Sequence, residues 1–165
     1  MRVEAGAITT SGVYAHGIVA QSIGGSGGMA GLKSGIDEAN HVYDIAGSGG
    51  AAGDGGVVSV TVGGAIAVGG LWAHGVFAQS ASGEGKDDKA GDVTVIVNAD
   101  VAATGSNGRA ILAQSEGKAH SGDIAITVAQ GVTVSTGLAG DVTIGLKDGN
   151  QNTVTNYGTI TQVNA

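Results

Sequence analysis

The chain has no cysteine, no proline, and few aromatic or charged side chains. Its 165 residues include Cys 0 and Pro 0, with 3% aromatic and 13% charged residues. Without cysteine, disulfide bonds, thiolate catalysis and cysteine-based metal sites are all excluded. With so few rings, the core has to be built from Val, Ile, Ala and Leu. Such a composition favours a thin interior lined by small aliphatic side chains over a thick sandwich core.

Positive charge is also scarce. Lys+Arg 7 against Asp+Glu 14 give a formal net charge of −7, and the basic residues form no cluster. This argues against binding to nucleic acid or to an anionic lipid surface.

The most hydrophobic stretch, residues 63–81, is interrupted by Gly69, Gly70, His74 and Gln79, so no membrane-spanning helix is predicted. The first residues also do not follow the pattern of a signal peptide.

Glycine, in contrast, is abundant. There are 33 glycines, without a strict three-residue period, which excludes a collagen helix. One strand-like phrase recurs between them: residues 13–22 return at 71–80 and, more loosely, at 106–115. Because a single copy cannot bury its own apolar residues, a repeated phrase of this kind indicates stacked copies of one structural unit.

A second phrase alternates Val or Ile with Thr or Ala, the period-2 pattern of a strand with one buried face. It occurs at residues 58–62, 92–97, 123–128 and 141–146. Between the two phrases lies a shorter strand, as at residues 65–68 and 100–104, and glycines mark the corners. The sequence therefore predicts an all-β fold: a parallel β-helix (β-solenoid) with three short strands per coil and glycine-rich loops, forming one segment over residues 1–165.

Two parts depart from the regular unit. Residues 23–56 are predicted to be a glycine-rich loop inserted between coils, with residues 41–45 as an added strand. In the last part the Ala-Gln-Ser strand is missing, and two short strands are expected on either side of the corner at Asn156, Tyr157 and Gly158.

The phrase at residues 17–28, followed by the glycine-rich residues 47–56 and a valine-rich strand at 57–62, resembles the passenger region of glycine-rich bacterial autotransporters. The closing residues 152–160 are similar to another recurrent passenger phrase, so the resemblance covers essentially the whole chain. It implies a right-handed parallel β-helix, exported through an outer membrane by a C-terminal β-barrel and exposed on the bacterial cell surface or released outside the cell. With no barrel strands in this chain, the resemblance implies a fragment of a longer passenger.

The resemblance also implies a structural or adhesive role as a rigid, protease-resistant stalk. Its partners would be further copies, through the edges or face of the solenoid, or a glycan or protein on a host or other surface. A β-helical polysaccharide-degrading enzyme is the alternative, and it needs paired carboxylates on a rigid frame. The carboxylate cluster at Glu84, Asp87 and Asp88 is expected on a solvated loop. No catalysis and no cofactor are therefore expected.

A second alternative is an ice-binding solenoid, which needs Thr-x-Thr rows on every coil. Residues 153–155 and 159–161 have this pattern, and the earlier coils do not repeat it. Residues 49–54 nearly match a calcium-binding nonapeptide, but Ala52 replaces a required glycine and no tandem copy follows. No metal site is predicted there.

Two repeat positions supply candidate binding residues. His16 and His74 share one position, where stacked imidazoles can bind a metal or respond to pH. Arg109 takes that position in the third copy and favours a solvent-exposed site that tolerates any polar side chain. Tyr14 and Trp72 share a corner position, where rings can stack on a sugar or on a partner protein, or can cap the edge of the thin core.

The same alignment predicts columns of equivalent side chains. Gln21, Gln79 and Gln114 are expected to form a hydrogen-bonded amide ladder with a structural role. Two buried apolar columns are predicted, one of Ile18, Val76 and Ile111 and the other of Ala20, Ala78 and Ala113. The more exposed positions are expected to be Tyr14, His16, Trp72, His74 and Arg109.

Overall fold

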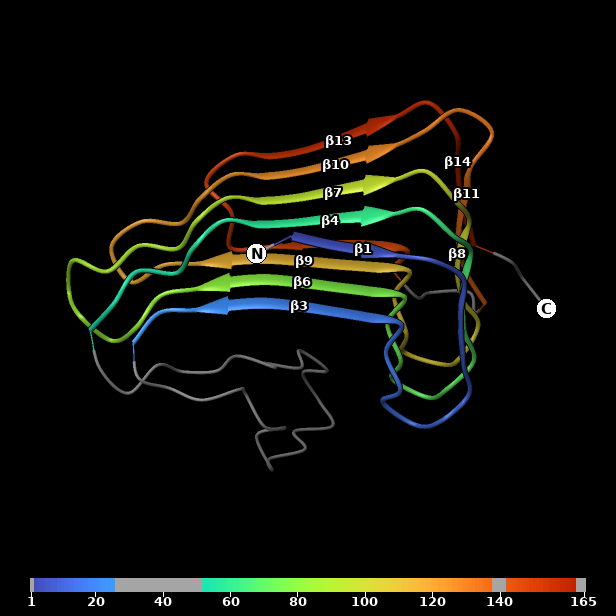
Figure 1. The fold of residues 1–165 in the computed structure, drawn as a ribbon, viewed down its shortest axis with the longest axis horizontal. Coiled ribbons are helices and arrows are strands. Elements are labelled where there is room, and N and C mark those ends of the chain that lie inside the picture. Colours follow the sequence, from blue (N-terminus) through green and yellow to red (C-terminus); the bar gives the residue numbers. More distant parts are fainter. Residues whose placement is uncertain (1, 26–51, 138–141, 163–165) are drawn as a thin grey trace.

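A computed structural model describes residues 2–25, 52–137 and 142–162. These residues form fourteen strands and no helix, and hence no helix that could cross a membrane (Figure 1). The strands are β1 Arg2–Ala5, β2 Ile8–Thr10, β3 Ile18–Ile23, β4 Val58–Val62, β5 Ile66–Val68, β6 Val76–Ala81, β7 Val93–Val97, β8 Val101–Ala103, β9 Ile111–Glu116, β10 Ile124–Val128, β11 Thr133–Thr136, β12 Ile144–Lys147, β13 Asn152–Asn156 and β14 Thr159–Gln162.

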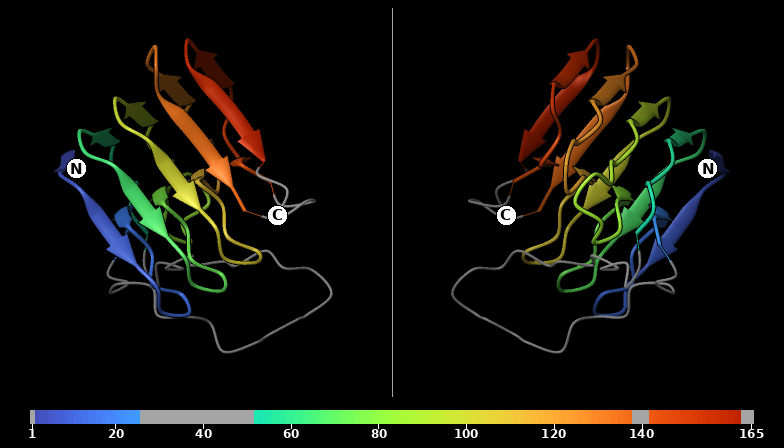
Figure 2. Two further views of the ribbon diagram at one scale, coloured as in Figure 1. Left: turned by 90° about the vertical axis from the view of Figure 1, so that its right-hand side faces the viewer. Right: turned by 90° about the vertical axis from the view of Figure 1, so that its left-hand side faces the viewer.

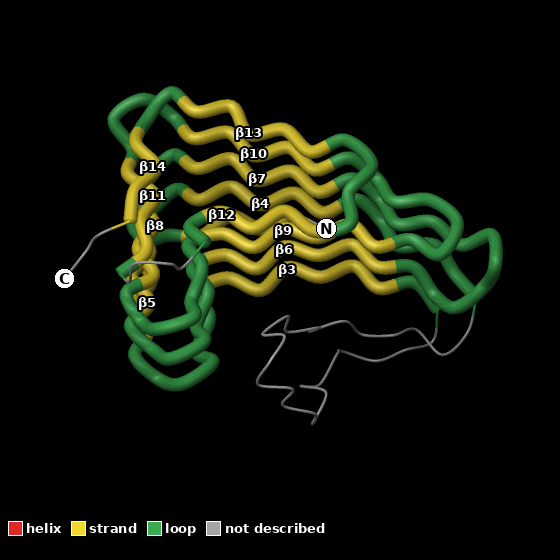
Figure 3. Tube along the Cα trace, turned by 180° about the vertical axis from the view of Figure 1, so that it is seen from behind, coloured by secondary structure: helices red, strands yellow, loops and turns green. Residues whose placement is uncertain are grey.

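The strands stack into three parallel sheets, each built from every third strand of the chain. The sheet orders are β1-β4-β7-β10-β13, β14-β11-β8-β5-β2 and β12-β9-β6-β3. Figure 2 shows the coils one above another, and Figure 3 shows the loops gathered at the corners between sheets. The chain is therefore a parallel β-helix with three strands per coil, as the sequence predicts.

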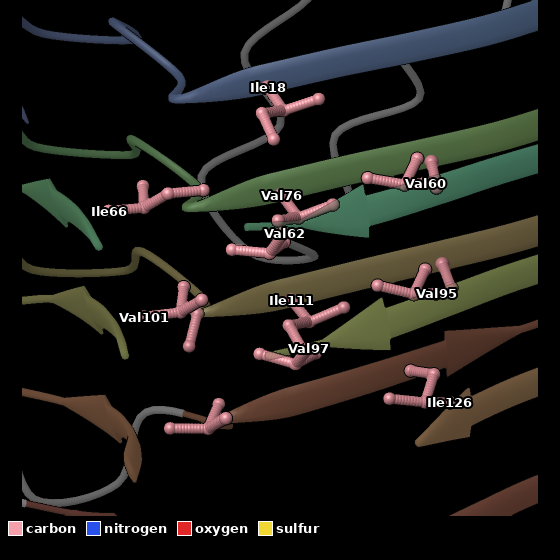
Figure 4. Close-up of a cluster of buried hydrophobic side chains, with 14 of the residues drawn as sticks. Ile18, Val60, Val62, Ile66, Val76, Val95, Val97, Val101, Ile111 and Ile126 are labelled. Carbon is pink, nitrogen blue, oxygen red and sulfur yellow. The ribbon is translucent and has the colours of Figure 1, made fainter. Parts of the chain in front are cut away.

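Equivalent residues of successive coils lie side by side. Ile18 pairs with Val76, which in turn pairs with Ile111, and the three side chains are 5%, 0% and 0% exposed. The alanine column beside them is fully buried. Valines and isoleucines of the other two sheets complete the core, and their side chains point into the space between the sheets (Figure 4). The prediction of both buried columns is confirmed.

The fourth coil corrects one prediction. Residues 141–146 have the same alternating phrase as β4, β7 and β10, which predicts a first strand of a coil, but the strand there, β12, pairs with β9 so that Ile144 lies beside Ile111. It is the third strand of its coil, because β11 already occupies the second position. The Ala-Gln-Ser strand is thus present in diverged form, with Lys147 paired to Gln114. Both strand types alternate with period 2, so periodicity alone does not distinguish them.

Strand β3 extends to Ile23, so the glycine-rich segment begins one residue later than predicted. β13 and β14 flank the corner at residues 156–158, as predicted. In the glycine-rich loop predicted at 23–56, the Gly24 amide donates to the Ala81 carbonyl oxygen at 2.8 Å. Residues 26–51, which include the strand expected at 41–45, lie outside the described residues.

Glycines at the corners allow neighbouring coils to approach closely. A Cβ on Gly70 would lie 1.8 Å from the Gly12 carbonyl oxygen, and one on Gly105 would lie 2.0 Å from the Gly70 carbonyl oxygen. Real side chains do not reach such distances, so a larger residue at either position forces the coils apart.

A matched pair of glycine substitutions tests this packing. We expect Gly105→Ala to lower the free energy of unfolding by about 1–3 kcal/mol, because the added methyl overpacks a backbone contact. Gly6→Ala, whose Cβ would meet nothing within 4 Å, is expected to be neutral or stabilising by less than about 1 kcal/mol. Urea denaturation of both variants measures the difference, and equal effects would contradict the in-register stack.

Candidate functional site

The candidate site lies where the chain turns from the second sheet into the third. Here Tyr14, Trp72 and Asn107 occupy equivalent positions with φ of 57°, 62° and 59°. In the first of these corners the Ala15 amide donates to the Gly12 carbonyl oxygen at 3.0 Å, the pattern of a type II turn with Tyr14 at its third position. The loops form the stack at the lower right of Figure 1.

Two of the three corner residues are poorly suited to this backbone. The third position of a type II turn favours glycine or asparagine, which Asn107 satisfies. Tyr14 and Trp72 are bulky residues in the left-handed region, which costs on the order of 1–3 kcal/mol each. Strain held at equivalent positions of two coils points to a role for the rings themselves.

The two rings belong to an apolar strip on the corner, formed by Val13, Tyr14, Leu71 and Trp72, here named the aromatic ridge. Val13 is 59% exposed and Leu71 is 42% exposed, while both rings are half-buried. The Tyr14 amide donates to the Leu71 carbonyl oxygen at 3.0 Å, which holds the two coils in register. The ridge ends at the third coil, because Ser106 takes the position of Val13 and Leu71.

Under the ridge, the two histidines connect three coils. The backbone amide of His74 donates to Nδ1 of His16 at 2.9 Å, and the backbone amide of Arg109 donates to Nδ1 of His74 at 3.0 Å. The rings are stacked, with centroids 5.0 Å apart and planes inclined by 20°. Each imidazole therefore accepts the hydrogen bond of the next coil.

The prediction that His74 is among the more exposed residues is wrong. His74 is only 2% exposed, while His16, Tyr14, Trp72 and Arg109 are half-buried. The ring is buried because it supplies an acceptor to an amide of the coil above. Arg109 at this position in the third copy suggests a surface position that tolerates any polar side chain. The third coil, however, only donates its Arg109 backbone amide to His74, so the Arg109 side chain does not need to be an acceptor.

Burial favours the neutral form of both imidazoles. It lowers the pKa of His16 below 6.5. For His74, burial first and then the positive charges of His16 and Arg109 lower the pKa to about 3. Since each Nδ1 already accepts a hydrogen bond, neither Nδ1 is free to bind a metal, and the described residues contain no group of three or more His, Cys, Asp or Glu placed to hold one.

The three glutamines form the predicted ladder. Nε2 of Gln21 donates to Oε1 of Gln79 at 2.7 Å, and Nε2 of Gln79 donates to Oε1 of Gln114 at 3.2 Å. Nε2 of Gln114 then donates to carboxylate oxygens of Glu116 at 2.8 Å and Asp148 at 3.1 Å. Gln79 and Gln114 are almost fully buried, so the ladder satisfies amides that water does not reach.

Sequence reasoning missed the role of the serine in the repeated phrase. Oγ of Ser80 donates to the Gly56 carbonyl oxygen at 3.0 Å and accepts from the Gly91 amide at 2.8 Å. Ser115 repeats this bridge between Gly91 and Gly122 at 3.0 and 2.8 Å. The recurrence of serine directly after each glutamine was the available signal.

It also missed the role of the aspartates that open the strands. Oδ1 of Asp92 accepts the amide of Asp123 at 2.9 Å, and Oδ1 of Asp123 accepts the amide of Gln151 at 3.1 Å. Asp100 accepts the amide of Thr133 in the same way at 2.7 Å. For Asp92 and Asp123 the repeated Gly-Asp pair carried this signal, since a carboxylate readily accepts backbone amides.

The expectation of a solvated acidic loop holds for two carboxylates and is wrong for the third. Glu84 lies 3.5 Å from the Lys118 amine, with both side chains exposed, and Asp87 pairs with neighbouring Lys86. Asp88 is buried, because its Oδ2 accepts the amides of Gly53 at 2.7 Å and Gly85 at 2.8 Å. It ties this loop to the segment that precedes β4.

The first sheet carries two in-register columns rich in hydroxyl groups. From β1 to β13, one column consists of Arg2, Ser59, Thr94, Ala125 and Thr153, and the other consists of Glu4, Thr61, Ile96, Thr127 and Thr155. Thr-x-Thr rows are therefore not present on every described coil.

Fold and site together define a parallel β-solenoid whose corners are braced by side-chain ladders. No family model, no curated protein and no solved structure matches the chain.

Replacing the carboxylates of the acidic loop one at a time separates their roles. We expect Asp88→Ala to lower the free energy of unfolding by about 1–3 kcal/mol, because two backbone amides lose their acceptor. Asp87→Ala is expected to change it by less than about 0.5 kcal/mol, as for other exposed residues. Thermal and urea denaturation provide the comparison. Equal values for the two variants would show that the Asp88 bonds do not support the loop.

Proposed function

We propose that this chain is a structural segment of an autotransporter-type passenger, exposed on a bacterial cell surface, where it forms a rigid stalk. The observation that carries the proposal is the unbroken register of its coils. All described strands pair in parallel with their equivalents, and equivalent residues also bond at the corners. The resemblance of residues 17–28 and 47–62 to glycine-rich passengers supplies the cellular setting.

Such a coil stack is suited to an exposed position. A protease must bind a substrate segment in an extended form pulled away from its neighbours, which here requires breaking pairings on both sides of an inner strand. Buried amides, hydroxyls and imidazoles are satisfied within the stack, so local opening leaves polar groups without partners. Stiffness and resistance to cleavage follow from the same bonds.

We assign an adhesive role to the aromatic ridge. Tyr and Trp rings are favoured at contact surfaces, because they bury a large apolar area with little conformational freedom to lose. The rings of Tyr14 and Trp72 are held at one spacing by the pairing of their coils. A regularly repeating glycan, whose sugar faces stack on rings, is the ligand class that fits this arrangement.

The alternatives have weaker support. A polysaccharide-degrading enzyme requires two carboxylates on a rigid frame, but Asp88, the buried carboxylate of the acidic loop, already accepts two backbone amides. An ice-binding role finds some support in the hydroxyl columns of the first sheet, although Ala125 and Ile96 interrupt them. We therefore propose no catalytic activity for this chain.

Surface display tests the stalk. The chain is placed between an export signal and an autotransporter barrel in Gram-negative cells, and residues 52–137 are followed by mass spectrometry during protease treatment. We expect the wild type and Ala125→Asp, at an exposed position, to resist cleavage there. Ile111→Asp, which places a charge at a position that is 0% exposed, should be degraded. Cleavage of the wild type as fast as that of Ile111→Asp would exclude a rigid stalk.

Adhesion is tested with variants that preserve the corner backbone. Because Asn107 already adopts the same φ, Tyr14→Asn together with Trp72→Asn removes the rings and retains the turn. We expect binding to immobilised neutral and acidic polysaccharides, measured by surface plasmon resonance, to weaken by about tenfold or more, as each ring contributes about 0.5–1.5 kcal/mol.

Tyr157→Asn is the control, since Tyr157 is 67% exposed at a different corner. Its binding should equal that of the wild type. Unchanged affinity of the double variant, or no binding of the wild type to any polysaccharide, would contradict the adhesive role and leave the stalk to be judged by surface display.

A further inference from the structure

The two imidazoles under the aromatic ridge act as hydrogen-bond acceptors for backbone amides of the next coil, as the carboxylates of Asp92 and Asp100 do at other corners. A neutral imidazole has one acceptor nitrogen, and in the imidazolium cation both nitrogens are donors. Nδ1 is the acceptor in both histidines, for the amides of His74 and Arg109. A proton can therefore be added only at the atom toward which a backbone amide already points.

The surroundings oppose the cation as well. His74 has the imidazole of His16 on one side, stacked at 5.0 Å, and Arg109 on the other. The ring of Phe77 lies beside His16, with centroids 6.5 Å apart. Burial first, then the charge that His16 would carry if protonated, and then the Arg109 guanidinium lower the pKa of His74.

We propose that this corner is an acid-sensitive latch, closed while both imidazoles are neutral and opened when they take up protons. Opening separates the corner loops of the first three coils by breaking the His16–His74 and His74–Arg109 bonds. The corners held by Asp92, Asp100 and Asp123 have no such latch, because a carboxylate oxygen and not an imidazole nitrogen accepts the amide there.

The direction of the effect follows from proton binding. In the open or unfolded chain a histidine titrates near 6.5, and in the closed corner the pKa of both is lower. The open form thus binds more protons as the pH falls below about 6.5, and the closed form loses stability there. For each histidine, the equilibrium constant for opening rises by up to about tenfold per pH unit, until the lower pKa is reached.

Opening also alters the aromatic ridge, because Tyr14 and Trp72 lie two residues before the latch histidines. If the aromatic ridge binds a glycan, the chain should therefore release that glycan on acidification. This consequence rests on the proposed function. The latch itself does not, since it depends only on bonds within the chain.

Amide hydrogen exchange tests the latch without any ligand. Exchange of the His74 and Arg109 amides is measured by NMR between pH 7.5 and 4.5 and corrected for intrinsic exchange rates. The fluorescence of Trp72, the one tryptophan of the chain, is recorded in the same samples. The test variant carries His16→Asn and His74→Asn, because asparagine provides an acceptor oxygen that does not titrate. The control is His120→Asn, at an exposed loop histidine.

In the wild type we expect the opening constant for both amides to rise by about tenfold or more between pH 6.5 and 5, with a change in Trp72 fluorescence over the same range. The double variant should vary by less than about threefold, and His120→Asn should follow the wild type. Flat protection in the wild type, or an unchanged pH dependence in the double variant, would overturn the proposal.

Should the double variant fail to fold, the wild-type imidazoles are titrated directly by ¹⁵N NMR. A latch requires both rings to be neutral with the proton on Nε2 at pH 7, and requires His74 in the folded protein to remain neutral well below pH 6.5. An unshifted titration of His74 in the folded protein, or a proton on its Nδ1, would exclude the latch.

Discussion

The interaction on which this structure depends is the bond between a residue and its equivalent one coil further along. Within strands the bond is made by backbone groups in the parallel ladders. At the corners, a side chain of one coil also accepts an amide of the next, as with Asp92, Asp100 and His16. Because buried amides need partners, these side chains are as necessary as the strands.

That dependence explains the composition of the chain. Columns of identical small side chains fill a thin core without large rings, and corner glycines let backbones meet at distances that no Cβ permits, as at Gly70 and Gly105. The absence of proline follows from the same constraint, since a residue without an amide hydrogen cannot join the ladder. Large hydrophobic residues are not needed in this core, because the small side chains of one coil pack against their equivalents in the next.

The sequence was sufficient for the fold, the apolar columns and the glutamine ladder, because each depends on the alignment of repeats. The sequence assigned β12 to the wrong sheet, because Ile144 and Leu146 alternate with their neighbours as residues of a first strand do. Only the order of strands within a coil shows that β12 belongs to the third sheet. The sequence also failed for His74 and Asp88. Their burial arises from backbone amides that meet them in space, and side-chain type alone does not reveal an acceptor role.

The side-chain amide dipoles of the glutamine ladder all point the same way along the axis of the solenoid. Carboxylates only accept hydrogen bonds, so Glu116 and Asp148 require Gln114 to present both of its amide hydrogens to them. Its oxygen must then face Gln79, whose oxygen in turn faces Gln21. The amide dipoles are therefore aligned and polarise one another along the axis. The carboxylates of Glu116 and Asp148 thus determine which way the Gln21 amide is oriented, two coils from Gln114. This coupling passes through side chains alone and requires no movement of the backbone.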